Sequence, residues 1–188
     1  MRIVNDNIYF KLIFAGTALA GKTTALQWIF NHVIPTEMKV SDNIRSVKTS
    51  FQQTLMFDFA PIKVTDNIYF RIYASTGQDY YSRVRELLTE GVDGIFFVVD
   101  SQKNQLEFNR EFVGELFSYL NLLHTSKDQV EVVVLYNKID LEDIYPLSFL
   151  QKELKLEQFP AFGTNALSGE NLKPAFNYII GKCLQKLR

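Results

Sequence analysis

The chain has 188 residues, which is enough to bury the core of one domain, and we expect a single domain over residues 1–188. Its 20 Lys and Arg nearly balance its 21 Asp and Glu, so no net positive charge favours nucleic acid as a partner. Cys183 is the only cysteine, which excludes an internal disulfide and a thiolate-rich metal site. This cysteine usage suits a reducing compartment, and we expect a cytoplasmic protein.

The ends and the apolar runs of the chain bear on membrane attachment. Residues 1–16 lack the apolar stretch and small-residue cleavage site of a secretory signal, and no apolar run is long enough to span a bilayer. Arg2 stands where myristoylation needs Gly, and Cys183 lies too far from the end to form a prenylation box. We therefore expect neither a transmembrane segment nor a lipid anchor.

Apolar and alternating runs predict strands and helices that follow one another along the chain. The predicted strands lie at 8–15, 51–60, 68–74, 94–100, 130–137 and, more weakly, near 159–163. The predicted helices lie at about 22–33, 80–90, 104–124, 146–156 and 170–187. Such alternation is typical of a mostly parallel sheet with helices on both faces. Asp66-Asn67 predicts a turn that joins the second and third strands into an antiparallel hairpin.

The segment FAGTALAGKTT follows the first predicted strand and precedes the first predicted helix. Gly16, four further residues and then Gly21-Lys22-Thr23 match the phosphate-binding loop of P-loop NTPases. Glycines let backbone N–H groups approach phosphate oxygens, and the N-terminus of the helix favours an anion. The alternative is a tight strand-to-helix turn with a solvated lysine.

If the loop binds phosphate, Lys22 is expected to reach the β and γ phosphates and Thr23 to offer its hydroxyl to Mg²⁺. The nucleotide contacts predicted in this loop are Gly16, Ala18, Leu19, Ala20, Gly21, Lys22, Thr23 and Thr24. Together with the order of strands and helices, the loop predicts a three-layer sandwich of the P-loop NTPase class. Its α/β architecture has a mostly parallel six-stranded sheet, one antiparallel hairpin strand, and helices on both faces.

The segment YNKID ends the strand predicted at 130–137, at the edge where parallel sheets place ligands. An aspartate here accepts hydrogen bonds from guanine N1–H and the 2-amino group, two donors that adenine lacks, so Asp140 predicts guanine selection. We expect the stem of Lys138 to lie against the base and Asn137 to tie this loop to the phosphate-binding loop. Alone, this short pattern is usually a polar loop; its place downstream of a phosphate-binding loop favours a function.

The segment TNALSGEN at 164–171 follows the weak sixth strand. The backbone N–H of Ala166 is expected to bond guanine O6, with Asn165 and Leu167 as neighbouring nucleotide contacts. The alternative is a helix N-cap at Ser168 followed by a glycine turn.

Two further segments contain residues suited to sensing a γ-phosphate. Thr54 in TSFQQTLMF offers a hydroxyl to the metal, so the predicted metal ligands are Thr23 and Thr54. Gly77 in YASTGQDYY offers an N–H to the γ-phosphate, and Gln78 orients a water molecule. The predicted catalytic residues are therefore Lys22, Gly77 and Gln78. The alternatives are an ordinary strand residue at 54 and a turn at 77–78.

These five segments, in this order, resemble the Ras-like small GTPases over nearly the whole chain. Four stretches within them resemble the MglA-type gliding-motility and polarity GTPases of prokaryotes: GTALAGKTTALQWIF, TLMFDF, GQDYYSRVRELLTEGVDGIFFVVDS and YNKID. The resemblance implies a switch that binds GTP or GDP with Mg²⁺, slowly hydrolyses GTP, and recruits effector proteins in its GTP state. Roadblock-type dimers activate MglA-like members, so the expected partners are effector and activator proteins, with a roadblock/longin-type dimer among them.

Two other functions compete with this one. A guanine-nucleotide-bound scaffold that does not hydrolyse GTP is the leading alternative. A nucleoside or nucleotide kinase shares the phosphate-binding loop but has no need of Asn137, Lys138 and Asp140, and the arginine-rich lid usual in such kinases is not visible in the sequence.

The sequence departs from the family pattern at several positions. Ala74 stands where most small GTPases have an aspartate that holds Mg²⁺ through water, and the MglA group shares this absence and has an acidic residue at the place of Asp58. Alternation puts position 58 on the same strand face as Thr54, so Asp58 is a candidate for the missing role; an edge-strand acid that discourages aggregation is the alternative. Gln53 replaces an arginine able to act as a built-in finger, and Ala18 replaces a glycine, which together predict slow turnover.

Overall fold

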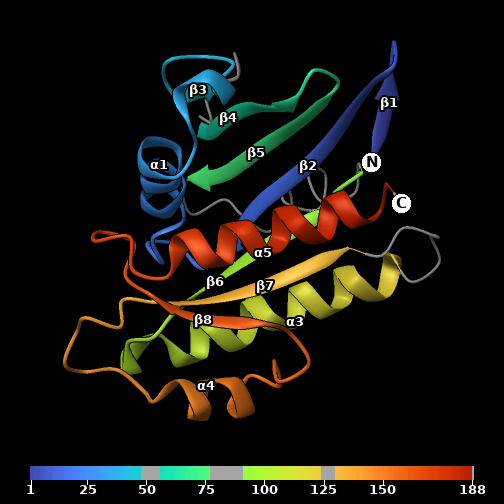
Figure 1. The fold of residues 1–188 in the computed structure, drawn as a ribbon. Helices are drawn as coiled ribbons and strands as arrows, with labels where there is room; N and C mark the ends of the chain where they lie inside the picture. Colours follow the sequence, from blue (N-terminus) through green and yellow to red (C-terminus); the bar gives the residue numbers. More distant parts are fainter. Residues whose placement is uncertain (48–55, 77–90, 124–129, 188) are drawn as a thin grey trace.

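A computed structural model of the chain describes residues 1–47, 56–76, 91–123 and 130–187, which form a central sheet with helices on both faces (Figure 1). The strands are β1 (Arg2–Val4), β2 (Asn7–Gly16), β3 (Arg45–Val47), β4 (Met56–Thr65), β5 (Ile68–Thr76), β6 (Gly94–Asp100), β7 (Glu131–Asn137) and β8 (Ala161–Thr164). The helices are α1 (Lys22–His32), α3 (Leu106–Leu123), α4 (Leu147–Glu153) and α5 (Leu172–Gln185), with 3₁₀ turns η1 (Thr36–Met38) and η2 (Lys103–Gln105).

The strand order is β3-β4-β5-β2-β6-β7-β8, and β1 pairs separately with β2. Strands β5, β2, β6, β7 and β8 run parallel, whereas β4 is antiparallel to both of its neighbours. Because the five parallel strands point the same way, their carboxyl ends meet at one edge of the sheet, and α1 begins at this edge (Figure 1). The predicted architecture is confirmed: the sheet is mostly parallel, β4 and β5 form the predicted antiparallel hairpin, and helices cover both faces.

The number of strands was predicted too low: the described residues form eight strands instead of six. The hairpin of β1 and β2 turns through Asn5 and Asp6, whose φ values of 47° and 62° are typical of a two-residue hairpin turn. The other added strand, β3, has only three residues, too few for a periodic signal. The predicted helix at 80–90 and the first residues of the predicted strand at 51–60 lie outside the described residues.

The strand β4 continues to Thr65, beyond the predicted end at residue 60. Pro61 lies inside this longer strand although proline lacks the N–H group of a sheet ladder. It is tolerated here since β3 pairs with β4 only as far as Phe59, which leaves Pro61 near an edge. The predicted turn at Asp66-Asn67 is present, and Lys63 pairs with Asp66 beside it at 3.0 Å.

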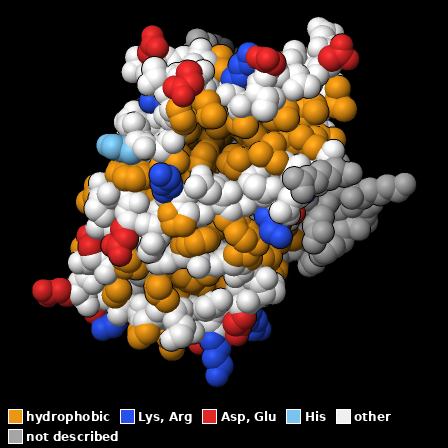
Figure 2. All heavy atoms as spheres, in the orientation of Figure 1, with side chains coloured by type: hydrophobic (Ala, Val, Ile, Leu, Met, Phe, Trp, Pro, Cys, Tyr) orange, Lys and Arg blue, Asp and Glu red, His pale blue; other side chains and the backbone are white. Residues whose placement is uncertain are grey.

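The protein has two hydrophobic cores, one on each face of the sheet, and successive residues of a strand belong to them in turn. Phe10, Leu12 and Phe14 of β2 belong to the core that includes α1 and α5, whereas Ile13 and Ala15 belong to the core that includes α3 and α4. The view in Figure 2 shows hydrophobic side chains gathered across the upper half of the face that α5 crosses, with charged side chains mainly around the outline. Among the described helices, none combines the length and apolar character that crossing a membrane requires.

Candidate functional site

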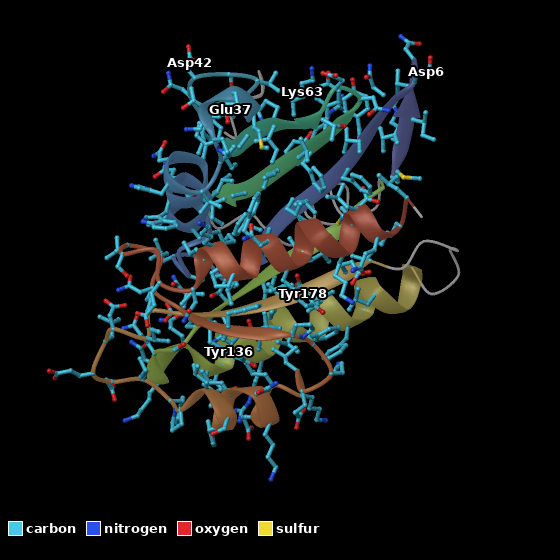
Figure 3. All side chains as sticks on the ribbon, in the orientation of Figure 1. Asp6, Glu37, Asp42, Lys63, Tyr136 and Tyr178 are labelled. Atoms are coloured by element: carbon cyan, nitrogen blue, oxygen red, sulfur yellow. The ribbon has the colours of Figure 1, made fainter. Side chains whose placement is uncertain are left out.

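The site is organised around Asn137, the last residue of β7. Tyr136 belongs to the core on the α4 side of the sheet (Figure 3), so strand alternation directs Asn137 to the α1 side. Its side-chain N–H donates to the carbonyl of Ala20 at 2.7 Å, and its Oδ1 accepts from the N–H of Ala166 at 2.9 Å and the hydroxyl of Thr164 at 3.2 Å. Asn137 is 3% exposed, so one buried amide links three loops.

The link between Asn137 and the phosphate-binding loop was predicted and is present. Thr164 was not predicted to take part. Its signal was its place directly after the strand predicted near 159–163; in the structure it is the last residue of β8, at the same sheet edge as the other loops.

The two glycines of the phosphate-binding loop are required by the protein itself. Gly16 has φ of +142°, and a Cβ there would overlap the carbonyl oxygen of Val98 on β6. Gly21 has φ of +100°, and a Cβ there would overlap the side-chain nitrogen of Asn137. The predicted reason for these glycines is close approach of a phosphate; a second reason is that Val98 of β6 and Asn137 lie where a side chain at positions 16 and 21 would begin.

Lys22 opens α1 with its ammonium group inside the loop. The Nζ atom donates to the carbonyls of Gly16 at 2.9 Å and Thr17 at 2.6 Å, and the residue is 5% exposed. Burial disfavours the charged form and lowers the pKa of Lys22 to about 8. A buried cation at the N-terminus of a helix is a strong attraction for an anion, so the chemistry of this loop fits a phosphate group.

The other loop residues differ in how much solvent they meet. Ala18 and Leu19 are exposed, and Leu19 has a left-handed backbone with φ of 60°. Ala20 is fully buried, and Thr23 and Thr24 are half-buried in the first turn of α1. Within the described residues the Thr23 hydroxyl has no hydrogen-bond partner, which fits the predicted role of a metal ligand.

The loop at 164–171 is shaped by its own side chains. Asn165 Oδ1 accepts the N–H groups of Leu167 at 2.9 Å and Ser168 at 3.3 Å, which closes a compact turn. Gly169 has φ of +84°, and a Cβ there would overlap the indole of Trp28, so α1 packs against this loop. The alternative of a helix N-cap at Ser168 is wrong, because α5 begins only at Leu172.

Ala166 was expected to offer its N–H to guanine O6. In the structure that N–H donates to Asn137, and Ala166 is 3% exposed. A role toward the base therefore stays a prediction, and it requires the N–H to be shared with Asn137 Oδ1. Leu167 beside it is 79% exposed and lies open to a ligand.

The two charged residues of the NKID segment are placed in opposite ways. Lys138 Nζ lies 2.6 Å from Asp100 Oδ2 and donates to Gln102 Oε1 at 3.1 Å. Asp140 is exposed, and no hydrogen bond or ion pair engages its carboxylate within the residues that the structure describes. Asp140 is thus available to a ligand, whereas Lys138 is held by the protein.

Asp100 and Gln102 were not among the predicted site residues. Asp100 ends β6 at the carboxyl edge of the sheet, and that position was the signal that could have found it.

Three predicted residues, Thr54, Gly77 and Gln78, lie outside the described residues. Asp58 is described only by its backbone, which pairs with Ala74 across the antiparallel ladder of β4 and β5. Ala74 is fully buried. Asp58 is therefore the direct cross-strand neighbour of position 74, where most small GTPases have an aspartate. In the described part of the chain no group of three or more His, Cys, Asp or Glu side chains is suited to a metal ion.

Comparisons with known proteins agree with this geometry. Residues 2–183 match the family model described as the ADP-ribosylation factor family. The mutual gliding-motility protein MglA of Myxococcus xanthus (strain DK1622) is 33% identical over 165 residues, which cover 85% of this chain and 82% of that protein. The solved structure of the Arl6 BBS3 small GTPase from Trypanosoma brucei, with the bound nucleotide analogue GppNp, has a TM-score of 0.69, 17% identity, and coverage of 95% of this chain and 99% of that one. At this identity the structural likeness concerns the fold.

Proposed function

We propose that this chain, which belongs to the ADP-ribosylation factor family of small GTPases, selects guanine nucleotides through Asp140 and holds their phosphates with Lys22. Membership of the family implies a GTP-binding switch, and the resemblance to MglA-type GTPases predicted from the sequence is confirmed. We further propose that the chain hydrolyses GTP slowly and acts through effector and activator proteins. Residues 1–188 would form one GTPase domain.

The observation that carries the proposal is the contrast between Asn137 and Asp140. Asn137 joins the phosphate-binding loop to the loop at 164–171, so a phosphate site and a base site are held at one edge of the sheet. Asp140 stands beside this junction with an exposed carboxylate. A carboxylate accepts two hydrogen bonds from guanine, and adenine presents no donor at the same places.

A competition titration tests the choice of base. We expect GTP and GDP to displace a fluorescent guanine nucleotide far more effectively than ATP. Asp140→Asn exchanges an acceptor for a donor, so it should weaken guanine and improve xanthine nucleotides, which carry a carbonyl at that place. Equal affinities of the wild-type protein for ATP and GTP would contradict the proposal.

Magnesium would be held by Thr23 in every nucleotide state and by Thr54 when GTP is bound. The bound ion would neutralise negative charge on the phosphates. Asp58 would take over the role of the aspartate that is missing at position 74. The pairing of Asp58 with Ala74 across the ladder of β4 and β5 supports this role. We expect Asp58→Ala to weaken Mg²⁺ binding in the GDP state and Ala74→Asp to strengthen it; no change in either variant would exclude this role.

Hydrolysis would depend on Gln78 orienting a water molecule, and it would be slow. Small GTPases that rely on such a glutamine alone turn over at about 10⁻⁴ to 10⁻³ per second, and a partner adds about 10³- to 10⁵-fold. Gln53 lacks the cationic charge of a built-in finger, and Ala18 adds a methyl group to the loop. Single-turnover assays of the wild type, Gln78→Leu and Ala18→Gly test this; a fast rate that survives Gln78→Leu would mean that another group is catalytic.

A scaffold that binds guanine nucleotides without hydrolysing them is the second candidate. Alanine at position 74 favours it, because its side chain offers no polar atom to a metal shell. Phosphate release with and without a roadblock-type dimer separates the two functions. Release that rises when the dimer is added supports a switch with an activator, and the absence of release under both conditions supports a scaffold.

A further inference from the structure

We propose that Asp100 and Gln102 are positioning residues that hold Lys138 ready for the guanine base, an inference that rests on the proposed function. Asp100 ends β6 and pairs with Asn137 in the ladder between β6 and β7. Its carboxylate lies 2.6 Å from Lys138 Nζ, and the side-chain oxygen of Gln102 accepts from the same nitrogen at 3.1 Å. Two acceptors from β6 and the residues after it thus hold a lysine that follows β7.

Both ends of Lys138 are held in place. Its backbone adopts the left-handed conformation with φ of 69°, and its ammonium group is bound by the two acceptors. The side chain is 26% exposed. A lysine that moves freely in solvent loses much rotamer freedom when a ligand orders it, which opposes binding. Because the stem of Lys138 is ordered beforehand, this loss is avoided when a base arrives.

Asp100 is itself fixed and depends on the lysine. Its side chain is 2% exposed, its second oxygen accepts the backbone N–H of Gln102 at 3.1 Å, and its carbonyl accepts from Asn109 at 2.8 Å. A buried carboxylate requires a counter-charge. Within the described residues, Lys138 is the cation that forms an ion pair with Asp100. The pair therefore couples the base-binding loop to the rigid end of β6.

Loss of the Asp100–Lys138 pair should weaken binding of the guanine base and leave binding of the phosphates unchanged. GTP and GDP share the same base, so losing the pair should speed the release of both to a similar extent. Binding of inorganic pyrophosphate depends on Lys22 and the glycines of the phosphate-binding loop, so it should be unaffected.

The release of a fluorescent GDP, followed by stopped flow, tests the positioning role. Asp100→Asn should speed release by about tenfold, because binding would then include the loss of rotamer freedom of the Lys138 side chain. Gln102→Ala, at a half-exposed position, should speed release by about threefold, since it removes a neutral acceptor. Both effects should vanish when Lys138→Met is also present, because the two residues act through the ammonium group.

The matched control is Asp143→Asn, which makes the same chemical change and removes the exposed Asp143–Lys103 pair of 2.8 Å. It should leave GDP release and pyrophosphate affinity unchanged. Release at the wild-type rate in both test variants, equal acceleration with and without Lys138→Met, or a parallel loss of pyrophosphate binding would overturn the positioning role. If Asp100→Asn does not fold, GDP release from Gln102→Ala, measured with and without Lys138→Met, tests the positioning role instead. A wild-type protein that binds ADP as well as GDP would instead refute the proposed function.

Discussion

Asn137 and Asp140 belong to one short segment and have opposite environments. Asn137 is 3% exposed and bonded to three other residues, whereas Asp140 is exposed and, in the described part of the chain, unbonded. The site therefore has two kinds of residue. The buried kind assembles the loops, and the exposed kind stays open to a ligand. Their substitution should therefore affect the free energy of unfolding very differently.

Asn137→Ala should have the largest effect. Removing the amide leaves the Ala20 carbonyl, the Ala166 N–H and the Thr164 hydroxyl without their partner, so we expect a loss of about 3 kcal/mol in unfolding free energy. Urea denaturation without nucleotide measures it. Asn104→Ala, at an exposed position, is the control and should change stability by less than about 0.5 kcal/mol. Similar values for the two variants would remove the contrast.

Gly21→Ala should come second. The substitution places a methyl group against the Asn137 side chain and forces a left-handed backbone on alanine, so we expect a loss of about 2 kcal/mol. Gly181→Ala in α5 is the matched control, because apart from its chain neighbours and the backbone of its own helix no atom lies within 4 Å of the added Cβ. It should stabilise the protein by about 0.5–1 kcal/mol. The same sign for both variants would contradict this explanation.

The buried Lys22 should make stability depend on pH. The pKa of Lys22 is about 8 in the folded chain and 10.5 in the unfolded chain, so the unfolded chain binds more protons between these values. The unfolding free energy should therefore rise with pH. Between pH 7 and pH 9 we expect a rise of about 1 kcal/mol in the wild type that is absent in Lys22→Met. Bound phosphate would hold the proton on Lys22 and remove the rise. Urea titrations from pH 7 to pH 9, with and without GDP, measure both effects.

Asp140→Asn should have the smallest effect on folding. Its carboxylate has no partner in the described residues, so the unfolding free energy without nucleotide should stay within about 0.5 kcal/mol of the wild type. The same variant should lose its preference for guanine. A loss of stability comparable to that of Asn137→Ala would show that Asp140 also belongs to the assembling residues.

Much of the fold followed from local patterns. The continuous apolar run at 94–100 predicted the exact bounds of β6, because a strand buried on both faces has no polar interruption. The first helix, predicted at about 22–33, was found at Lys22–His32. Strands β1 and β3 were missed since three residues are too short for a period to be recognised. Ser168 was wrongly considered as a helix cap, because the turn closed by Asn165 delays α5.

The chemical groups available to the site could be identified from the sequence: the glycine-rich loop with its lysine, the NKID segment after a strand, and an alanine at position 74. These depend on residue identity and short spacing, which the chain encodes locally. Three contacts could be seen only in the folded chain: Asp100 holds Lys138, Val98 leaves no room for a side chain at Gly16, and Asp58 pairs with Ala74. Each of these contacts joins residues on different strands or loops, so it depends on strand order and register. Order and register are set by how the whole core packs, and no local pattern contains them.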